Sequence, residues 1–293
     1  MSDTPAKPSQ ILLATDFSAR SDRSLDRALA LARSWEAELI VTHVIEPEPE
    51  AMWDNGDPFA WQRWPEREDE IREMIRSDLG DEAGNARLVI EHGSPVDRIA
   101  AVAERTDAGL IVTGVARSST FGRAILGTTV QRLVRTAYVP VLVVKRRVIS
   151  DYRKILITFD FSEASAHAVR YAAALFPDAS LTLLHGYDAP FLANDRQAFA
   201  DFLRKAEQQE VDNFLDKAVP DARTRERVDV VIGHGEPVRL AKTYSDEKKP
   251  DLTVVASHGR GAVYELAIGS IATKLLAELP SDILLVRRPR PAP

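Results

Sequence analysis

The second half of this sequence repeats landmarks of the first half at a fixed distance. Three landmarks return 142 residues later: His43 as His185, the turn at residues 92–96 as the turn at residues 234–238, and Gly127-Thr128 as Gly269-Ser270. Solenoid and propeller repeats run about 20 to 50 residues, so a period this long indicates two copies of a whole domain. We therefore predict one domain over residues 1–147 and a second over residues 148–293, and we expect a functional site in each.

The composition is that of a folded chain with two ordinary cores. Of the 293 residues, 45% are hydrophobic and 28% are charged, which is enough apolar material for two domains. Cysteine is absent, which excludes disulfides, thiolate catalysis and cysteine zinc sites. The net charge of -6 gives no sign of a nucleic-acid footprint, so we expect no nucleic-acid partner.

Neither a membrane span nor a secretory signal is expected. The longest apolar runs, such as residues 139–144, are far shorter than the roughly 18 residues that a transmembrane helix needs. The opening residues lack the basic and apolar regions of a secretory signal, so we expect a cytoplasmic protein.

Short apolar runs alternate with amphipathic stretches in each half. In the first half they predict strands at residues 10–15, 38–45, 87–90, 109–113 and 139–145, and helices at residues 21–35, 66–79, 96–105 and 128–136. In the second half they predict strands at residues 154–158, 181–185, 228–232, 252–255 and 283–287. The strand runs lack strict apolar and polar alternation, which favours a parallel sheet covered on both faces by helical crossovers. Each copy is therefore an α/β domain of five β/α units.

In an open parallel sheet, ligands bind outside the carboxyl ends of the strands, where the strand order reverses. Asp16 and Asp160 follow the first strand of each copy. The fourth strand leads into Gly114-x-x-Arg117, nine residues and Gly127-Thr128 in the first copy. In the second copy it leads into Ala256-x-x-Gly259, nine residues and Gly269-Ser270. Small residues admit a phosphate close to the backbone, and the amides that open the next helix donate to it.

With these motifs in both copies, the chain resembles the universal stress protein family in its tandem two-domain form. Nucleotide-binding members carry Gly-x-x-Gly, nine residues and Gly-(Ser/Thr), together with an acidic residue after the first strand. The resemblance covers nearly the whole chain. It implies two Rossmann-like domains, each a five-stranded parallel sheet of order 3-2-1-4-5 flanked by helices, with ATP bound in the cleft and a cytoplasmic stress role. Mg²⁺ is expected with ATP, because hard cations bridge phosphate oxygens.

The resemblance also implies which positions surround the nucleotide. In the second copy they are Asp160, Gly186, Ala256, His258, Gly259, Gly269, Ser270 and Ile271. In the first copy they are Asp16, Val44, Gly114, Arg117, Gly127, Thr128 and Thr129. Each copy departs from the motif once. Arg117 replaces a glycine and either pairs with a phosphate or fills its place, whereas Ala256 is a small change. Nucleotide binding is therefore expected to be more secure in the second copy.

Structural explanations stand beside these functional ones. The glycines are also ordinary turn residues. Asp16, Asp160, Ser18 and Ser162 are also suited to capping the following helix. The repeated histidines suit hydrogen bonding at strand ends better than metal binding, because none lies at a ligand spacing from another. His258 either touches the ligand or only shapes its turn.

No sequence signature of catalysis is present. There is no Gly-x-x-x-x-Gly-Lys-(Ser/Thr) loop, Gly-x-Ser-x-Gly elbow, His-Glu-x-x-His helix or Gly-x-Gly-x-x-Gly after the first strand. We assign no catalytic residue, and at most weak ATP hydrolysis is expected. The leading hypothesis is a nucleotide-dependent sensor or regulator, with protein partners that the sequence does not name and a homodimer left open. The alternative is an interaction scaffold whose clefts bind protein partners or another small ligand.

One segment, residues 46–65, holds three of the four tryptophans among acids and prolines. Such aromatics usually pack as a small cluster under a long loop, and that is the favoured interpretation. The alternative is a partner surface or a lid over the nucleotide cleft.

Overall fold

The computed structural model describes most of both copies. The described residues are 5–16, 21–46, 64–115, 117–118, 124–125, 127–187, 209–219, 221–257 and 268–287. They form two compact units. One comprises Pro8–Arg117 and Leu126–Val148, and the other comprises Met1–Lys7, Ser118–Ile125 and Ile149–Pro293.

The first copy contains a five-stranded parallel sheet. Its strands are β1 (Gln10–Ala14), β2 (Glu38–Ile45), β3 (Ala86–His92), β4 (Leu110–Thr113) and β7 (Val141–Val143). They lie in the order β3-β2-β1-β4-β7, and every pair is parallel. Counted along the chain, this is the order 3-2-1-4-5 that the resemblance implies.

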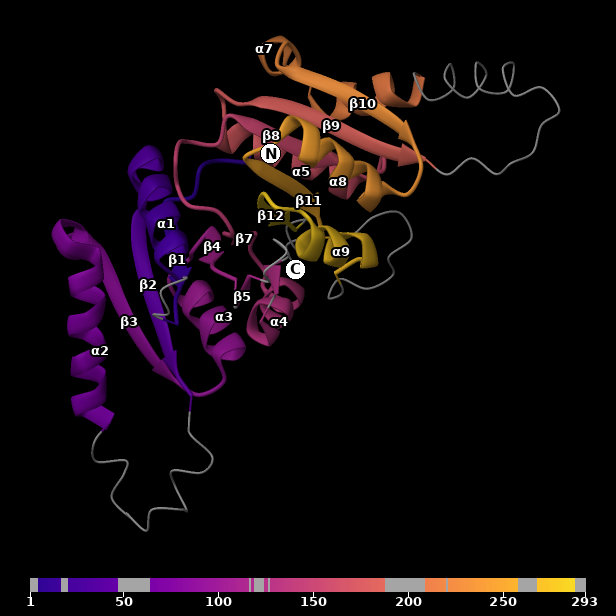
Figure 1. Ribbon diagram of the computed structural model, residues 1–293. Coiled ribbons are helices and arrows are strands. Elements are labelled where there is room, and N and C mark those ends of the chain that lie inside the picture. Colours follow the sequence, from indigo (N-terminus) through magenta and orange to yellow (C-terminus); the bar gives the residue numbers. More distant parts are fainter. Residues whose placement is uncertain are drawn as a thin grey trace, which may run out of the picture. The chain divides into compact units, whose positions relative to one another are not determined.

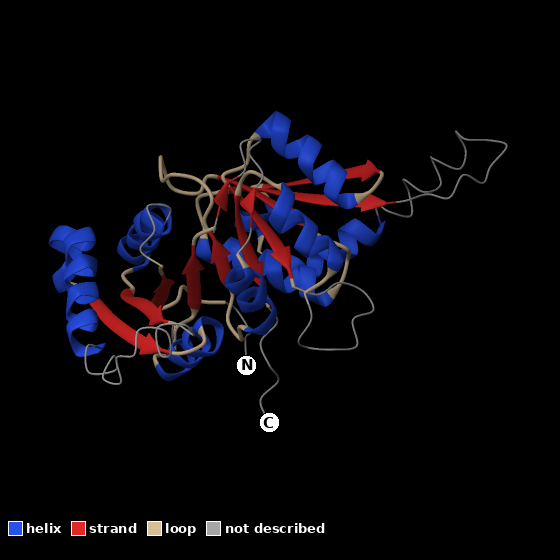
Figure 2. Ribbon diagram, turned by 60° about the horizontal axis from the view of Figure 1, so that its bottom comes forward, coloured by secondary structure: helices blue, strands red, loops and turns tan. Residues whose placement is uncertain are grey.

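Helices cover both faces of this sheet. They are α1 (Ser21–Trp35), α2 (Trp64–Leu79), α3 (Pro95–Arg105) and α4 (Thr128–Thr136), and a 3-10 turn, η2 (Gly80–Gly84), follows α2. The chain moves outward from β1 to β3 and then returns across β1 to β4, so right-handed connections place α1 and α2 on one face and α3 and α4 on the other. Figure 1 labels the four helices, and Figure 2 shows the strands as a layer between helices.

The second copy repeats this arrangement. Its strands are β8 (Lys154–Thr158), β9 (Ser180–Tyr187), β10 (Val228–His234), β11 (Leu252–Ala256) and β12 (Asp282–Val286), in the parallel order β10-β9-β8-β11-β12. Its helices are α5 (Glu163–Leu175), the short α7 (Ala222–Arg225), α8 (Pro237–Lys248) and α9 (Ser270–Glu278), and residues 209–218 are also helical. The predicted α/β class is confirmed in both copies.

The central strands are buried on both faces. Ile11, Leu12 and Leu13 are consecutive, and each is fully buried; residues 155–157 of β8 are almost as inaccessible. Alternate side chains of a strand point to opposite faces, so burial of three in a row requires cover on both sides, as the sequence predicted.

Four short elements were not predicted. They are η2, α7 and the paired two-residue strands β5 (Arg117–Ser118) and β6 (Ala124–Ile125). None of the helices in the described part of the chain is long and apolar enough to cross a membrane. Most of the tryptophan-rich segment, residues 47–63, lies outside the described residues.

Candidate functional site

The carboxyl ends of β8 and β11 meet where the strand order of the second copy reverses. Thr158 is the register partner of Val255 in these neighbouring strands, so Asp160 and Ala256 leave the sheet at the same edge. The start of α9 is tied to this edge, because the Gly269 amide donates a hydrogen bond to the Ser257 carbonyl at 3.1 Å. Three of the predicted segments are therefore brought together here.

Gly269 lies directly before the first turn of α9. This residue is the N-cap, with φ -63° and ψ 152°, a conformation that any residue adopts. A Cβ built on it would lie 3.9 Å from its nearest neighbour, the Ser257 carbonyl oxygen. Neither the backbone nor the packing against described residues therefore requires glycine at this position. A glycine N-cap also offers no side-chain acceptor to the amides of the first turn. Ser270 and Ile271, which follow, are exposed.

The first copy has the same frame. Ala14 is the register partner of Thr113 in β1 and β4. Gly127 is the N-cap of α4 with φ -63° and ψ 154°, and Thr128 after it is exposed. Gly114 and Thr129 are half-buried. The two helix starts are therefore nearly identical in backbone conformation.

Asp160 lies within the turn that opens α5. Its Oδ1 accepts hydrogen bonds from the Ser162 amide at 3.1 Å and from the Ser165 hydroxyl at 2.7 Å. The N-cap itself is Ser162, whose side chain accepts from the Ser165 amide at 3.2 Å. The capping role predicted for Ser162 is thus observed, and Asp160 sits two residues before the cap. Ser18, its counterpart, lies outside the described residues.

The sequence reasoning missed the serine that binds each aspartate. In the first copy the Ser21 hydroxyl donates to Asp16 Oδ1 at 2.5 Å, which matches the bond from Ser165 to Asp160. The spacing Asp-x-Ser-x-x-Ser occurs at residues 16–21 and again at residues 160–165. This repeat was the signal that could have revealed the pair.

Gly186 has a packing reason to be glycine. A Cβ there would lie 2.9 Å from Leu240 Cδ1, 3.0 Å from the Gly235 carbonyl oxygen and 3.1 Å from Pro237 Cα. The close approach of β9 to the start of α8 therefore excludes a side chain. Val44 occupies the corresponding place near the end of β2 and is half-buried.

The repeated histidines hold strand ends together. His43 Nδ1 lies 2.9 Å from the Thr15 carbonyl oxygen, and His185 Nδ1 lies 2.9 Å from the Phe159 carbonyl oxygen. A carbonyl oxygen only accepts, so each Nδ1 is the donor. These bonds favour the structural role. Across the described ranges, no group of three or more histidine, aspartate or glutamate side chains is placed to hold a metal ion.

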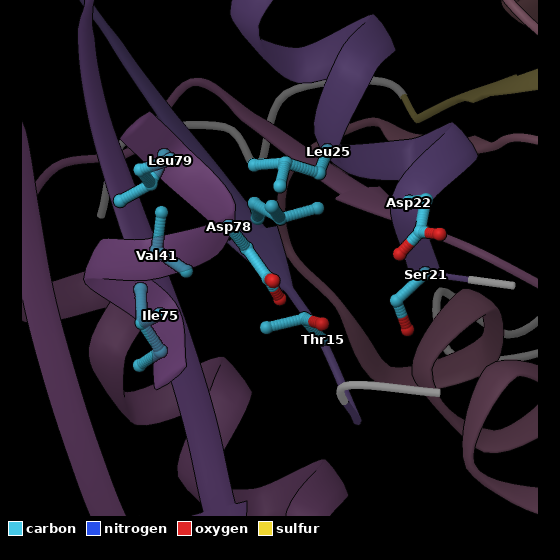
Figure 3. Close-up of a pocket in the computed structure, with 9 residues that line it drawn as sticks. Thr15, Ser21, Asp22, Leu25, Val41, Ile75, Asp78 and Leu79 are labelled. Carbon is cyan, nitrogen blue, oxygen red and sulfur yellow. The ribbon is translucent and has the colours of Figure 1, made fainter. Parts of the chain in front are cut away.

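The two copies differ behind this edge. In the first copy, residues of β1, α1, β2 and α2 line a small cavity of about 10 Å³, close to the space of one water molecule. Its floor is apolar, with Val41 and Ile75, and its rim carries Thr15 and Asp78, whose carboxylate points toward Thr15 in Figure 3.

Aromatic rings gather at the corresponding place in the second copy. Phe159 stands where Thr15 stands in the first copy, and its ring stacks on Phe214 with centroids 4.9 Å apart. Phe161 and His185 complete the cluster, with their own ring centroids 4.6 Å apart. Phe161 also has φ +63°, which is uncommon for a bulky residue.

Three predicted site positions are not placed by this geometry. His258 and Gly259 lie outside the described residues, and Arg117 is described only as backbone in β5. Ala256 ends β11 as an ordinary strand residue and is not among the described residues with positive φ. The alanine is therefore compatible with its backbone.

Known proteins resemble this chain over its whole length. A model of the universal stress protein family matches it twice, at residues 8–145 and 151–287. A universal stress protein of Mycolicibacterium smegmatis is 27% identical over 298 residues, covering 94% of this chain and 96% of that protein. The universal stress protein in the QAH/OAS sulfhydrylase 3′ region of Thermus aquaticus is 35% identical over 140 residues, covering 46% of this chain and 97% of that protein. The crystal structure of a universal stress protein from Archaeoglobus fulgidus has a TM-score of 0.69 and 21% identity, covering 95% of this chain and 98% of that one.

Proposed function

This chain belongs to the universal stress protein family, and from that premise we propose that its second copy binds an adenine nucleotide, ATP first, at the edge between β8 and β11. The bound nucleotide biases the conformation or the partner choice of the protein, which acts as a sensor or regulator in a cytoplasmic stress response. No residue is assigned to catalysis.

The observation that carries this proposal is the glycine at the start of α9. Gly269 has an extended backbone, and no atom of the described residues lies closer than 3.9 Å to the place of a Cβ, so neither its conformation nor the described part of the chain explains its lack of a side chain. A ligand that approaches the backbone closely supplies one. Helix N-termini with exposed amides attract phosphate, through both hydrogen bonding and the positive end of the helix dipole.

The acidic residue beside this edge adds a hydrogen-bond acceptor with negative charge to a site whose helix start attracts phosphate. Asp160 follows β8, the neighbour of β11 in the sheet. A carboxylate at this point repels phosphate and accepts hydrogen bonds from N–H or O–H groups. A nucleotide satisfies both ends, because it carries phosphates at one end and donors on its ribose and base at the other.

Mg²⁺ is proposed to enter with the triphosphate. Among the described residues no cluster of three or more suitable ligands stands ready for a metal. Mg²⁺ commonly binds through phosphate oxygens and water with few protein ligands. The available groups therefore fit a metal carried by the nucleotide better than a metal held by the protein alone.

The test begins with the protein as purified. Denaturation followed by nucleotide chromatography shows whether adenine nucleotide is carried along, and calorimetric titration with ATP and GTP measures affinity with and without Mg²⁺. We expect ATP to bind. Absence of both heat and thermal stabilisation at millimolar ATP would exclude the nucleotide function and favour the interaction scaffold, for which the substitutions at Arg117 and Ala256 argue.

A further inference from the structure

Each copy contains a serine that binds the aspartate of the candidate site. Ser165 is the third residue of α5, and its hydroxyl lies 2.7 Å from Asp160 Oδ1. Ser21 is the first residue of α1, and its hydroxyl lies 2.5 Å from Asp16 Oδ1. Both serines are buried, with 2% and 8% of their surface exposed, so neither hydroxyl is an ordinary solvated group.

Resting on the proposed nucleotide site, we propose that Ser165 and Ser21 are positioning residues: each fixes the side-chain rotamer of its aspartate and so aims the carboxylate at the ligand. Neither serine needs to touch the nucleotide. An aspartate at a strand end otherwise samples several rotamers. If the ligand requires one rotamer, its apparent affinity falls in proportion to the fraction of protein that has that rotamer.

In the second copy two donors hold the same oxygen. The Ser162 amide reaches Asp160 Oδ1 at 3.1 Å, in addition to the Ser165 hydroxyl. Ser165 Oγ also accepts from the Asp160 amide at 3.2 Å, so the serine holds both the backbone and the side chain of Asp160. A carboxylate is planar and rigid. With Oδ1 held by two donors and the backbone of Asp160 restrained, the direction of Oδ2 is therefore set as well.

The recurrence of this bond separates it from incidental packing. The two copies share the segment Asp-Phe-Ser-x-x-Ser, at residues 16–21 and 160–165, and therefore the serine and aspartate pair at the same spacing of five residues. Positions that flank this segment differ: Thr15 corresponds to Phe159, and Arg23 corresponds to His167. The pair thus lies in a short segment that both copies keep while the flanking positions change.

The test is a double-mutant cycle on ATP affinity, with Ser165→Ala, Asp160→Ala and the two combined. We expect Ser165→Ala to weaken binding by about tenfold, within the strength of a hydrogen bond to a charged group, and to have no further effect once Asp160 is alanine. A loss that persists in the Asp160→Ala background would mean that Ser165 acts on the helix start instead, and would overturn the inference. No loss in the single variant would overturn it as well.

Ser162→Ala is the matched control. It removes the N-cap side chain of α5 and its 3.3 Å hydrogen bond to Ser165 Oγ, but leaves both donors to Asp160 Oδ1, the Ser162 amide and the Ser165 hydroxyl. Stability should therefore fall while ATP affinity stays within about twofold. If Ser165→Ala folds poorly, Ser21→Ala tests the same device in the first copy, read out as rotation of Asp16.

A structure of the ligand-free Ser165→Ala variant separates this inference from the nucleotide function. Rotation of the Asp160 carboxylate supports positioning, even if wild-type protein binds no ATP and the proposed function fails. A carboxylate that keeps its place overturns positioning, even if ATP binds.

Discussion

Replacing Gly186 by alanine adds one carbon atom where the second copy has no room for it. The added Cβ would lie 2.9 Å from Leu240 Cδ1, 3.0 Å from the Gly235 carbonyl oxygen and 3.1 Å from Pro237 Cα, against about 3.5 to 4.0 Å for a comfortable carbon contact. The leucine methyl can rotate away. The other two atoms are backbone of the turn into α8, where Gly235 has φ +132°. We expect a loss of about 1 to 3 kcal/mol, typical of an overpacked core, and a melting temperature lower by roughly 3 to 10 °C.

The assay must distinguish the two copies, because a chain of two units need not unfold in one step. All four tryptophans lie in the first copy, at residues 35, 53, 61 and 64. Tryptophan fluorescence in urea therefore follows the first copy, whereas circular dichroism follows both. Gly186→Ala should lower the urea midpoint of the circular dichroism change that belongs to the second copy, which tryptophan fluorescence does not report.

Gly269→Ala is the control in the same unit, because the nearest described atom to its Cβ is 3.9 Å away. The weaker N-cap and the reduced freedom of the unfolded chain nearly offset one another, so stability should change by less than about 0.5 kcal/mol. Equal stabilities of Gly186→Ala and wild-type protein would refute the packing explanation of this glycine.

Three further predictions concern the helix-start glycines, Arg227 and Asp221. Gly269→Val should weaken ATP binding more than Gly127→Val, since Arg117 departs from the motif in the first copy; the reverse order in calorimetry would identify Arg117 as a phosphate ligand. Arg227 donates to the carbonyls of Ala173, Phe176 and Ala179 at 2.8 to 3.0 Å, so Arg227→Met should cost about 1.5 to 3 kcal/mol in urea denaturation, and lysine should not restore the loss. The hydrogen bond from the Thr224 amide holds the pKa of Asp221 below its ordinary value. The ionised carboxylate therefore stabilises the folded protein above about pH 4, and this contribution is lost as the pH falls through the folded pKa. Asp221→Asn should make the free energy of unfolding depend less on pH in this acidic range.

The fold could be predicted from this sequence because its elements are long and their periods are clear. The helix at residues 128–136 has the predicted bounds and follows its N-cap, Gly127. The helix that ends at Trp35 has the predicted end. The short elements η2 and α7 were missed because four or five residues show no period.

Candidate site positions could be named from the sequence, but the contacts that their side chains and backbone make could not. Gly186 was expected among the positions around the nucleotide, yet its type is explained by atoms of Gly235, Pro237 and Leu240, about 50 residues away along the chain. No local sequence pattern indicates such a contact. The bond from Ser165 to Asp160 was missed for a different reason: the repeated spacing was visible, but only Ser18 and Ser162 were considered, as caps. The assignment of these residues to nucleotide binding stays a prediction.

The two copies provide an internal comparison that a single domain lacks. They share the glycine at the N-cap of the last helix, the aspartate after the first strand and the serine that binds it. They differ behind that edge, where Thr15 lines a small cavity and Phe159 stacks on Phe214. The shared groups are those that would hold phosphate and a hydrogen-bond donor. Two differences remain: Arg117 stands where the second copy has Gly259, and Thr15 stands where it has Phe159. If both copies bind nucleotide, we expect a difference in phosphate affinity to arise at Arg117 and a difference in the rest of the ligand to arise at the residue before the aspartate. Exchanging Thr15 and Phe159 between the copies would then alter base selectivity without abolishing phosphate binding.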